Sequence, residues 1–197
     1  MKNIILSFLI IILSPSISNA HILQGDGGFL SGLTHPVLGF DHFLAMLSVG
    51  ILSAQMGGRA IWTVPATFVS VMAVGALLGI KGINIPGVEY GIALSVLVLG
   101  FSLAMEKKLL PIWAMLCVGC FAIFHGHAHG TEMPRIVQPI VYSLGFLLGT
   151  ASIHICGVLI GVFSGRTVRG AEILRFVGAG ISGVGVHIIY ILTKYNI

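Results

Sequence analysis

Residues 136–163 read IVQPIVYSLGFLLGTASIHICGVLIGVF and contain no Asp, Glu, Lys or Arg. This run exceeds the roughly 20 apolar residues that an α-helix needs to cross a bilayer. Five further apolar stretches flank it, at about 36–56, 61–80, 88–105, 111–128 and 173–192. Backbone polar groups must be paired within lipid, and no alternating barrel pattern occurs, so we expect each stretch to be a helix. The sequence thus predicts an all-α integral membrane protein, a six-helix transmembrane bundle.

The composition of the 197-residue chain supports this fold class. Hydrophobic residues make up 56% of the chain and charged residues 8%, whereas a typical soluble domain has about 25% charged residues. The loops are too short to hold a separate soluble domain. The basic residues are scattered among those loops, so the net charge of +4 gives no reason to expect nucleic-acid binding.

The first twenty residues are typical of a secretory signal peptide. Lys2 precedes a short apolar core from Ile4 to Leu13, and small residues end the segment at Ala20. We expect cleavage after Ala20, which leaves residues 21–197 as one transmembrane domain. The alternative is an uncleaved anchor helix. Either case places His21 on the non-cytoplasmic side.

The basic residues also predict the orientation of the helices. With His21 outside, the cytoplasmic loops and their edges contain Arg59, Lys107, Lys108, Arg166, Arg169 and Arg175, and the outer segments contain Lys81, Arg135 and Lys194. This excess of basic residues inside agrees with the positive-inside rule. The first mature helix then begins outside and the fourth helix ends outside.

Two histidine-rich clusters lie at those two outer helix ends. The first cluster reads HPVLGFDH over residues 35–42, and the second reads FHGHAHGTE over residues 124–132. Imidazole and carboxylate groups are costly near lipid and mark ion or proton pathways there. They are also ligands of borderline divalent metals. A metal-ion site that uses both clusters is the strongest functional prediction from these residues.

In the first cluster, His35 and His42 are seven residues apart, or about 10 Å along a straight helix. One ion cannot bind both at metal–nitrogen distances of about 2 Å. Either the segment bends near Gly39, or the two histidines form successive stations on an entry path. We expect Pro36 in the first helical turn, with His35 near the cap position.

In the second cluster, the i, i+4 spacing of His125 and His129 places two imidazoles on one helix face. Glu132 shares that face if the helix continues. The two glycines of the cluster leave this continuation open, because they can open the backbone where it lines a cavity. His127 points elsewhere on a regular helix and is interpreted as a loop or capture residue.

Other side chains complete the set of candidate metal ligands. Asp41 offers an oxygen ligand beside His42. Met46 lies one turn below and offers a thioether, although packing is the commoner role of methionine. His154, near the middle of the fifth span, is a candidate for a deeper station or a proton carrier. His21 would combine a free amine with its imidazole after cleavage, unless it lies in a disordered terminus.

At these residues the chain resembles the HupE/UreJ family of nickel and cobalt permeases. The family's pattern of His, five residues and Asp-His matches His35, Asp41 and His42, and its motif Phe-His-Gly-x-Ala/Val-His-Gly-x-Glu matches residues 124–132. The resemblance implies a multi-pass permease of the bacterial cytoplasmic (inner) membrane with a periplasmic mature N-terminus. It implies inward movement of Ni²⁺, or Co²⁺, for enzymes such as hydrogenase or urease. Its functional residues are carried over to His35, Asp41, His42, His125, His129 and Glu132, and a family histidine falls at His154.

Three functions fit such a ligand set. We expect secondary transport, with the metal ion as substrate, no catalytic cofactor, and the ion and the lipid bilayer as partners; the sequence leaves homo-oligomerisation open. A membrane-embedded metalloenzyme, a metal-activated hydrolase, would use the same ligands to activate water, but the chain has no dedicated nucleophile or substrate-binding loop. A metal-sensing subunit would need a partner to transmit its state.

Overall fold

The computed structural model describes residues 28–106, 110–134 and 137–195, and over these ranges it contains seven α-helices and no strands. The helices are α2 (Phe29–Leu38), α3 (Phe40–Met56), α4 (Ala60–Ile80), α5 (Val88–Met105), α6 (Pro111–Thr131), α7 (Pro139–Ser164) and α8 (Val168–Tyr195). The predicted signal peptide, residues 1–20, and His21 lie outside the described residues. The all-α fold class is confirmed.

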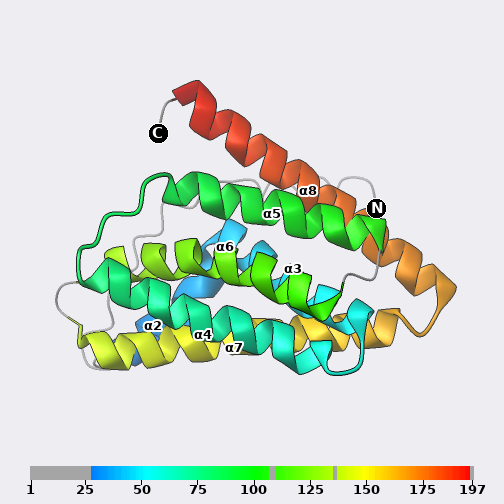
Figure 1. Cartoon of the computed structure of the whole chain (residues 1–197), viewed down its shortest axis with the longest axis horizontal. Coiled ribbons are helices and arrows are strands. Elements are labelled where there is room, and N and C mark those ends of the chain that lie inside the picture. Colours follow the sequence, from blue (N-terminus) through cyan, green and yellow to red (C-terminus); the bar gives the residue numbers. More distant parts are fainter. Residues whose placement is uncertain (1–27, 107–109, 135–136, 196–197) are drawn as a thin grey trace, which may run out of the picture.

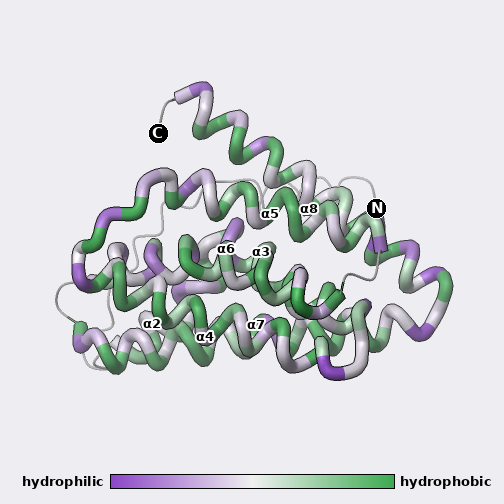
Figure 2. The backbone as a smooth tube through the Cα atoms, in the orientation of Figure 1, coloured by the Kyte–Doolittle hydropathy of each residue, from purple (hydrophilic) through white to green (hydrophobic). Residues whose placement is uncertain are grey.

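Five of these helices, α4 to α8, are long and apolar enough to cross a membrane. The pair α2 and α3 passes the same test together, although it is bent by 84°, so it forms a sixth span if it counts as one broken helix. Figure 2 shows hydrophobic residues along the helices and hydrophilic residues mostly at the turns. The chain is therefore a multi-pass helical membrane protein.

The first span begins earlier than predicted. α2 starts at Phe29, and Pro36 lies inside the helix instead of in its first turn. Proline lacks the N–H that continues a helical ladder, and α2 ends two residues later, at Leu38. Gly39 then adopts an extended backbone (φ −79°, ψ 103°) before α3 begins. The apolar pattern did not predict the early start because Gly32 and its polar neighbours interrupt it.

The helices pack in pairs. α4 packs on α6, α5 packs on α8, and both α2 and α3 pack on α7. In Figure 1, α8 crosses the bundle obliquely next to α5, with α4 and α7 on the other side. The two histidine clusters are brought together at the end of the bundle where α2 meets α3 and α6 ends.

The glycines of the second cluster do not open the backbone, as α6 stays helical through to Thr131. A Cβ on Gly126 would overlap the carbonyl of Met72, and a Cβ on Gly130 would overlap that of Ala76. Both glycines therefore allow the backbones of α4 and α6 to approach closely, which is a common use of small residues between membrane helices.

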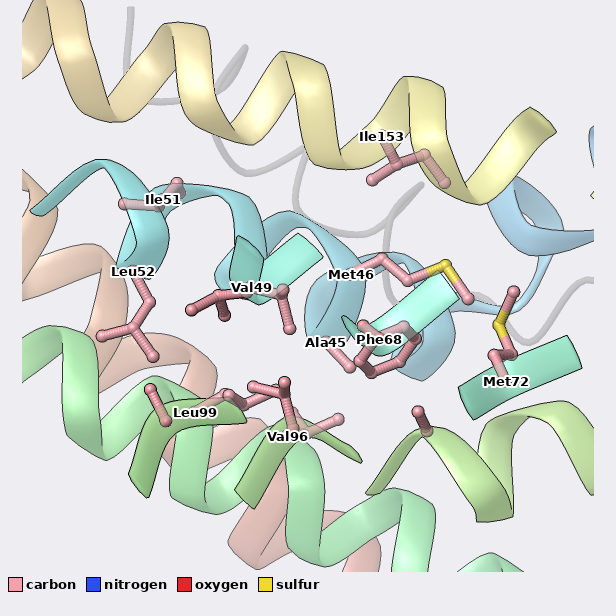
Figure 3. Close-up of a cluster of buried hydrophobic side chains, with 14 of the residues drawn as sticks. Ala45, Met46, Val49, Ile51, Leu52, Phe68, Met72, Val96, Leu99 and Ile153 are labelled. Carbon is pink, nitrogen blue, oxygen red and sulfur yellow. The ribbon is translucent and has the colours of Figure 1, made fainter. Parts of the chain in front are cut away.

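An apolar core is formed by side chains of all helices from α3 to α8. Figure 3 shows Met46 in this core beside Met72 and Phe68. All three side chains are fully buried. The Thr150 hydroxyl donates a weak hydrogen bond to the sulfur of Met72, at 3.9 Å. This core separates the histidine clusters from the opposite end of the bundle.

Candidate metal site

Three predicted ligands meet where the surface of the bundle passes into its interior, since Glu132 is exposed and His129 is buried. His35, at the end of α2, and His129 and Glu132, at the end of α6, each offer one ligand atom within 4.8 Å of the others. His35 Nε2 donates a hydrogen bond to Glu132 Oε2, at 3.0 Å. This bond lowers the pKa of the Glu132 carboxyl below its ordinary value, so the carboxylate is ionised at neutral pH. A group of two imidazoles and a carboxylate at this spacing could hold a divalent metal ion.

The bend at Gly39 brings both histidines of the first cluster, His35 and His42, next to the ring of His129. The His35 ring lies 5.0 Å from the ring of His129, and the His42 ring lies 4.7 Å from it, between centroids. On a straight helix the pair would be about 10 Å apart along the axis. Of the two alternatives left open by the sequence, the bend near Gly39 is confirmed.

The contacts continue inward from His42. Its ring lies 4.7 Å from the ring of His125 in an edge-on arrangement. The rings of His35, His129, His42 and His125 thus form a connected row, which we call the histidine file. Its outer end is partly exposed, since the side chains of His35 and its partner Glu132 are 31% and 50% exposed, whereas His129, His42 and His125 are buried. The file therefore runs from the surface into the interior.

Asp41 contacts the file through His42. Its Oδ1 accepts hydrogen bonds from the His42 backbone N–H at 2.8 Å and from the ring Nδ1 at 2.9 Å. A carboxylate only accepts, so Nδ1 holds a ring proton, and in the neutral imidazole Nε2 keeps its lone pair. Among the described residues, His42 Nε2 is buried without a hydrogen-bond partner. Asp41 therefore orients His42 with this lone pair free.

His154 lies deeper than the file and is separated from it by Phe68. The Phe68 ring centroid is 5.5 Å from that of His125 and 5.2 Å from that of His154. His154 is buried, and neither ring nitrogen has a partner within the described ranges. Met46 is packed in the core next to Phe68 (Figure 3). The predicted deeper residues thus lie below the file without joining it.

His127 is not the loop residue that its sequence position indicated. It lies on α6, nearly buried, and its Nε2 donates a hydrogen bond to the carbonyl of Ile83 at 2.7 Å. The carbonyl belongs to the connection between α4 and α5. His127 therefore holds this connection against α6, away from the rings of the file.

The sequence pattern did not predict the residues that support the histidine rings. Phe146 on α7 stacks on His129 with centroids 5.1 Å apart, and the Tyr142 ring lies 6.0 Å from that of His35. Ser95 on α5 contacts His125. Each is distant in sequence from the ring that it contacts. The sequence gives only a weak local indication of Ser95, namely a hydroxyl group inside an apolar span.

Comparisons with known proteins show the family of the chain. Residues 9–188 match the family model described as HupE / UreJ protein. The chain is 43% identical over 166 residues to Protein HupE of Rhizobium leguminosarum bv. viciae, and the match covers 84% of this chain and 86% of that protein. No solved structure matches the chain. The chain therefore belongs to the HupE/UreJ family, a transporter-type family of membrane proteins associated with nickel and cobalt transport.

Proposed function

We propose that this protein carries a divalent transition-metal ion, Ni²⁺ or Co²⁺, across the bacterial cytoplasmic membrane into the cell. The observation that carries this proposal is the histidine file, which connects the partly exposed ring of His35, beside Glu132, to the fully buried ring of His125. Family membership and the similarity to Protein HupE agree with it. The ion is the substrate of a secondary transporter, and its entry side is the periplasm.

Capture takes place at the trio of His35, His129 and Glu132, where Glu132 is exposed, His35 is partly exposed and His129 is buried. The ionised carboxylate attracts the cation, and imidazole suits nickel and cobalt. Entry of the ion breaks the hydrogen bond between His35 and Glu132. His35 then binds the ion through the ring nitrogen that carries the lone pair and keeps its one proton on the other nitrogen, and the Glu132 carboxylate turns to the ion. A mixed set of three ligands serves transport because a transported ion must also leave.

Transfer inward uses the shared ring of His129. His42 lies next to it with its Nε2 lone pair free, and Asp41 holds the ring in that orientation. His125 is the following station. Each step exchanges one imidazole for the next, so the ion keeps nitrogen ligands as it loses its water shell.

Beyond His125, the ring of Phe68 lies between His125 and His154 and blocks passage of the ion. We assign His154 to the next station and Met46 to a neighbouring soft contact. Passage requires the Phe68 ring to move, since this side chain is fully buried between the two histidines. The concentration gradient of the ion or the membrane potential drives the transport of the ion.

The first test is uptake of radioactive nickel by cells that express the wild type, Asp41→Ala, His129→Ala and, as control, His187→Ala. His187 is an exposed histidine of α8, which packs mainly on α5. We expect uptake to be lost in the first two variants and kept in the control, at matched membrane levels. Cobalt and zinc as competitors rank the metals. Wild-type uptake equal to that of empty cells, with the protein inserted, contradicts the proposal.

A further inference from the structure

The inner end of the histidine file is held by a hydroxyl group from another helix. Ser95 lies on α5 and is fully buried. Its Oγ lies 2.6 Å from the backbone carbonyl oxygen of Ile92 and 2.8 Å from Nε2 of His125. The same oxygen therefore makes two hydrogen bonds, one within its own helix and one to the file.

The proton positions in this pair of bonds follow from the donors present. A carbonyl oxygen has no proton to give, and a serine hydroxyl has one. Two oxygens 2.6 Å apart need that proton between them, so Ser95 donates to Ile92. The hydroxyl then has only lone pairs for His125, and the bond to His125 requires a proton on Nε2.

A neutral imidazole has one ring proton, so Nδ1 of His125 is left with a free lone pair. Within residues 28–106, 110–134 and 137–195, this Nδ1 is buried and lacks a hydrogen-bond partner. Such an atom is costly to bury. The nearest rings are those of His42 and Phe68, so His125 carries its unsatisfied lone pair at the junction between the file and the deeper core.

We infer that Ser95 is a positioning residue, which fixes His125 as the Nε2-protonated tautomer so that Nδ1 is the atom that binds the metal ion. Asp41 does the converse for His42, where Nδ1 holds the proton and Nε2 is free. Removal of such a supporting partner typically lowers metal affinity by about 10–100-fold. The metal-binding half of this inference rests on the proposed function, whereas the tautomer does not.

The test compares Ser95→Ala with Ser102→Ala in the purified full chain. Ser102 lies on the same helix and also donates its hydroxyl to a backbone carbonyl, that of Val98 at 2.8 Å. Ring ¹⁵N–proton correlation spectra at about pH 8, where free imidazole is neutral, report which nitrogen of His125 is protonated. A His125→Gln sample assigns the signals. Nickel affinity is measured on the same samples.

We expect one Nε2-protonated form of His125 in the wild type and in Ser102→Ala. Ser95→Ala should lose the signal of the hydrogen-bonded Nε2 proton and bind nickel about 10–100-fold more weakly. A wild-type proton on Nδ1 overturns the inference, and this observation needs no variant. Equal nickel affinity of Ser95→Ala and Ser102→Ala also overturns it. If the wild type binds no nickel, the proposed function fails, while the wild-type spectrum still decides the tautomer.

Discussion

The two histidine clusters contain glycine in similar surroundings, yet their helices behave in opposite ways. In the first cluster the helix stops at Gly39, and the chain turns by 84°. In the second cluster α6 continues past Gly126 and Gly130. The bend places His35 and His42 against one ring, whereas the unbroken helix keeps His125 and His129 one turn apart. The effect of a glycine on a membrane helix therefore depends on what packs against it.

The largest effect that distinguishes the clusters is expected at Gly126. A Cβ there would overlap the carbonyl of Met72 on α4, so Gly126→Ala forces the two helices apart. Overpacking of this kind costs about 1–3 kcal/mol or more. The melting temperature of the purified protein in detergent should fall clearly. The control is Gly183→Ala on α8, where a Cβ meets nothing within 4 Å. Equal melting temperatures of the two variants would contradict the packing role of Gly126.

Two histidines of the second cluster provide the next comparison, because they lie two residues apart and have different partners. His129→Ala should reduce nickel uptake about 100-fold or more, since His129 contacts both His35 and His42. His127→Ala should keep most uptake and lower the free energy of unfolding by about 0.5–1.5 kcal/mol, because the hydrogen bond from His127 to the carbonyl of Ile83 is lost. Uptake assays and denaturant unfolding measure the two effects. Loss of uptake in properly folded His127→Ala would show that His127 belongs to the path.

The sequence predicts those differences whose physical cause lies within the same helix. It does not predict those whose cause lies on another helix. The spans follow from apolar length alone, and the i, i+4 spacing of His125 and His129 is enough to place both on one helix face. The role of Gly126 could not be predicted locally because its reason lies on α4, in the carbonyl of Met72. The bend at Gly39 stayed one of two alternatives, since either geometry satisfies the local sequence.

The residues that support the histidine file could not be predicted from the sequence, for the same reason. Ser95 is one serine in an apolar span, and a serine there is usually satisfied by a carbonyl of its own helix, as Ser102 is. Only the packing of α5 against the file gives it His125 as a second partner. Phe146 is likewise one aromatic residue among many apolar ones. Pairs of helices distant in sequence create these contacts, and no spacing within either helix encodes them.

External pH tests whether the imidazoles of both clusters act as ligands. A histidine must be neutral to bind metal, and its ordinary pKa is about 6.5. Nickel uptake should be high above that range and fall about tenfold between about pH 7.5 and 5.5. The hydrogen bond from His35 lowers the pKa of Glu132, so this carboxylate stays ionised throughout and does not cause the loss. Uptake that rises steadily on acidification would instead indicate proton coupling.

The smallest effect, and the one that isolates the bend, is expected for Gly39→Ala. The backbone of Gly39 is one that any residue adopts, so the variant should fold and insert like the wild type. A Cβ there would lie 3.2 Å from Nδ1 of His42, so the His42 ring must also shift slightly. Alanine favours a continuous helix over glycine by about 1 kcal/mol, and a straighter segment moves His35 away from His129. Nickel affinity should therefore fall about fivefold, with melting unchanged, whereas Gly126→Ala changes melting first. A Gly39→Ala protein with wild-type affinity would mean that the packing of α2 and α3 on α7, and not the glycine, sets the bend.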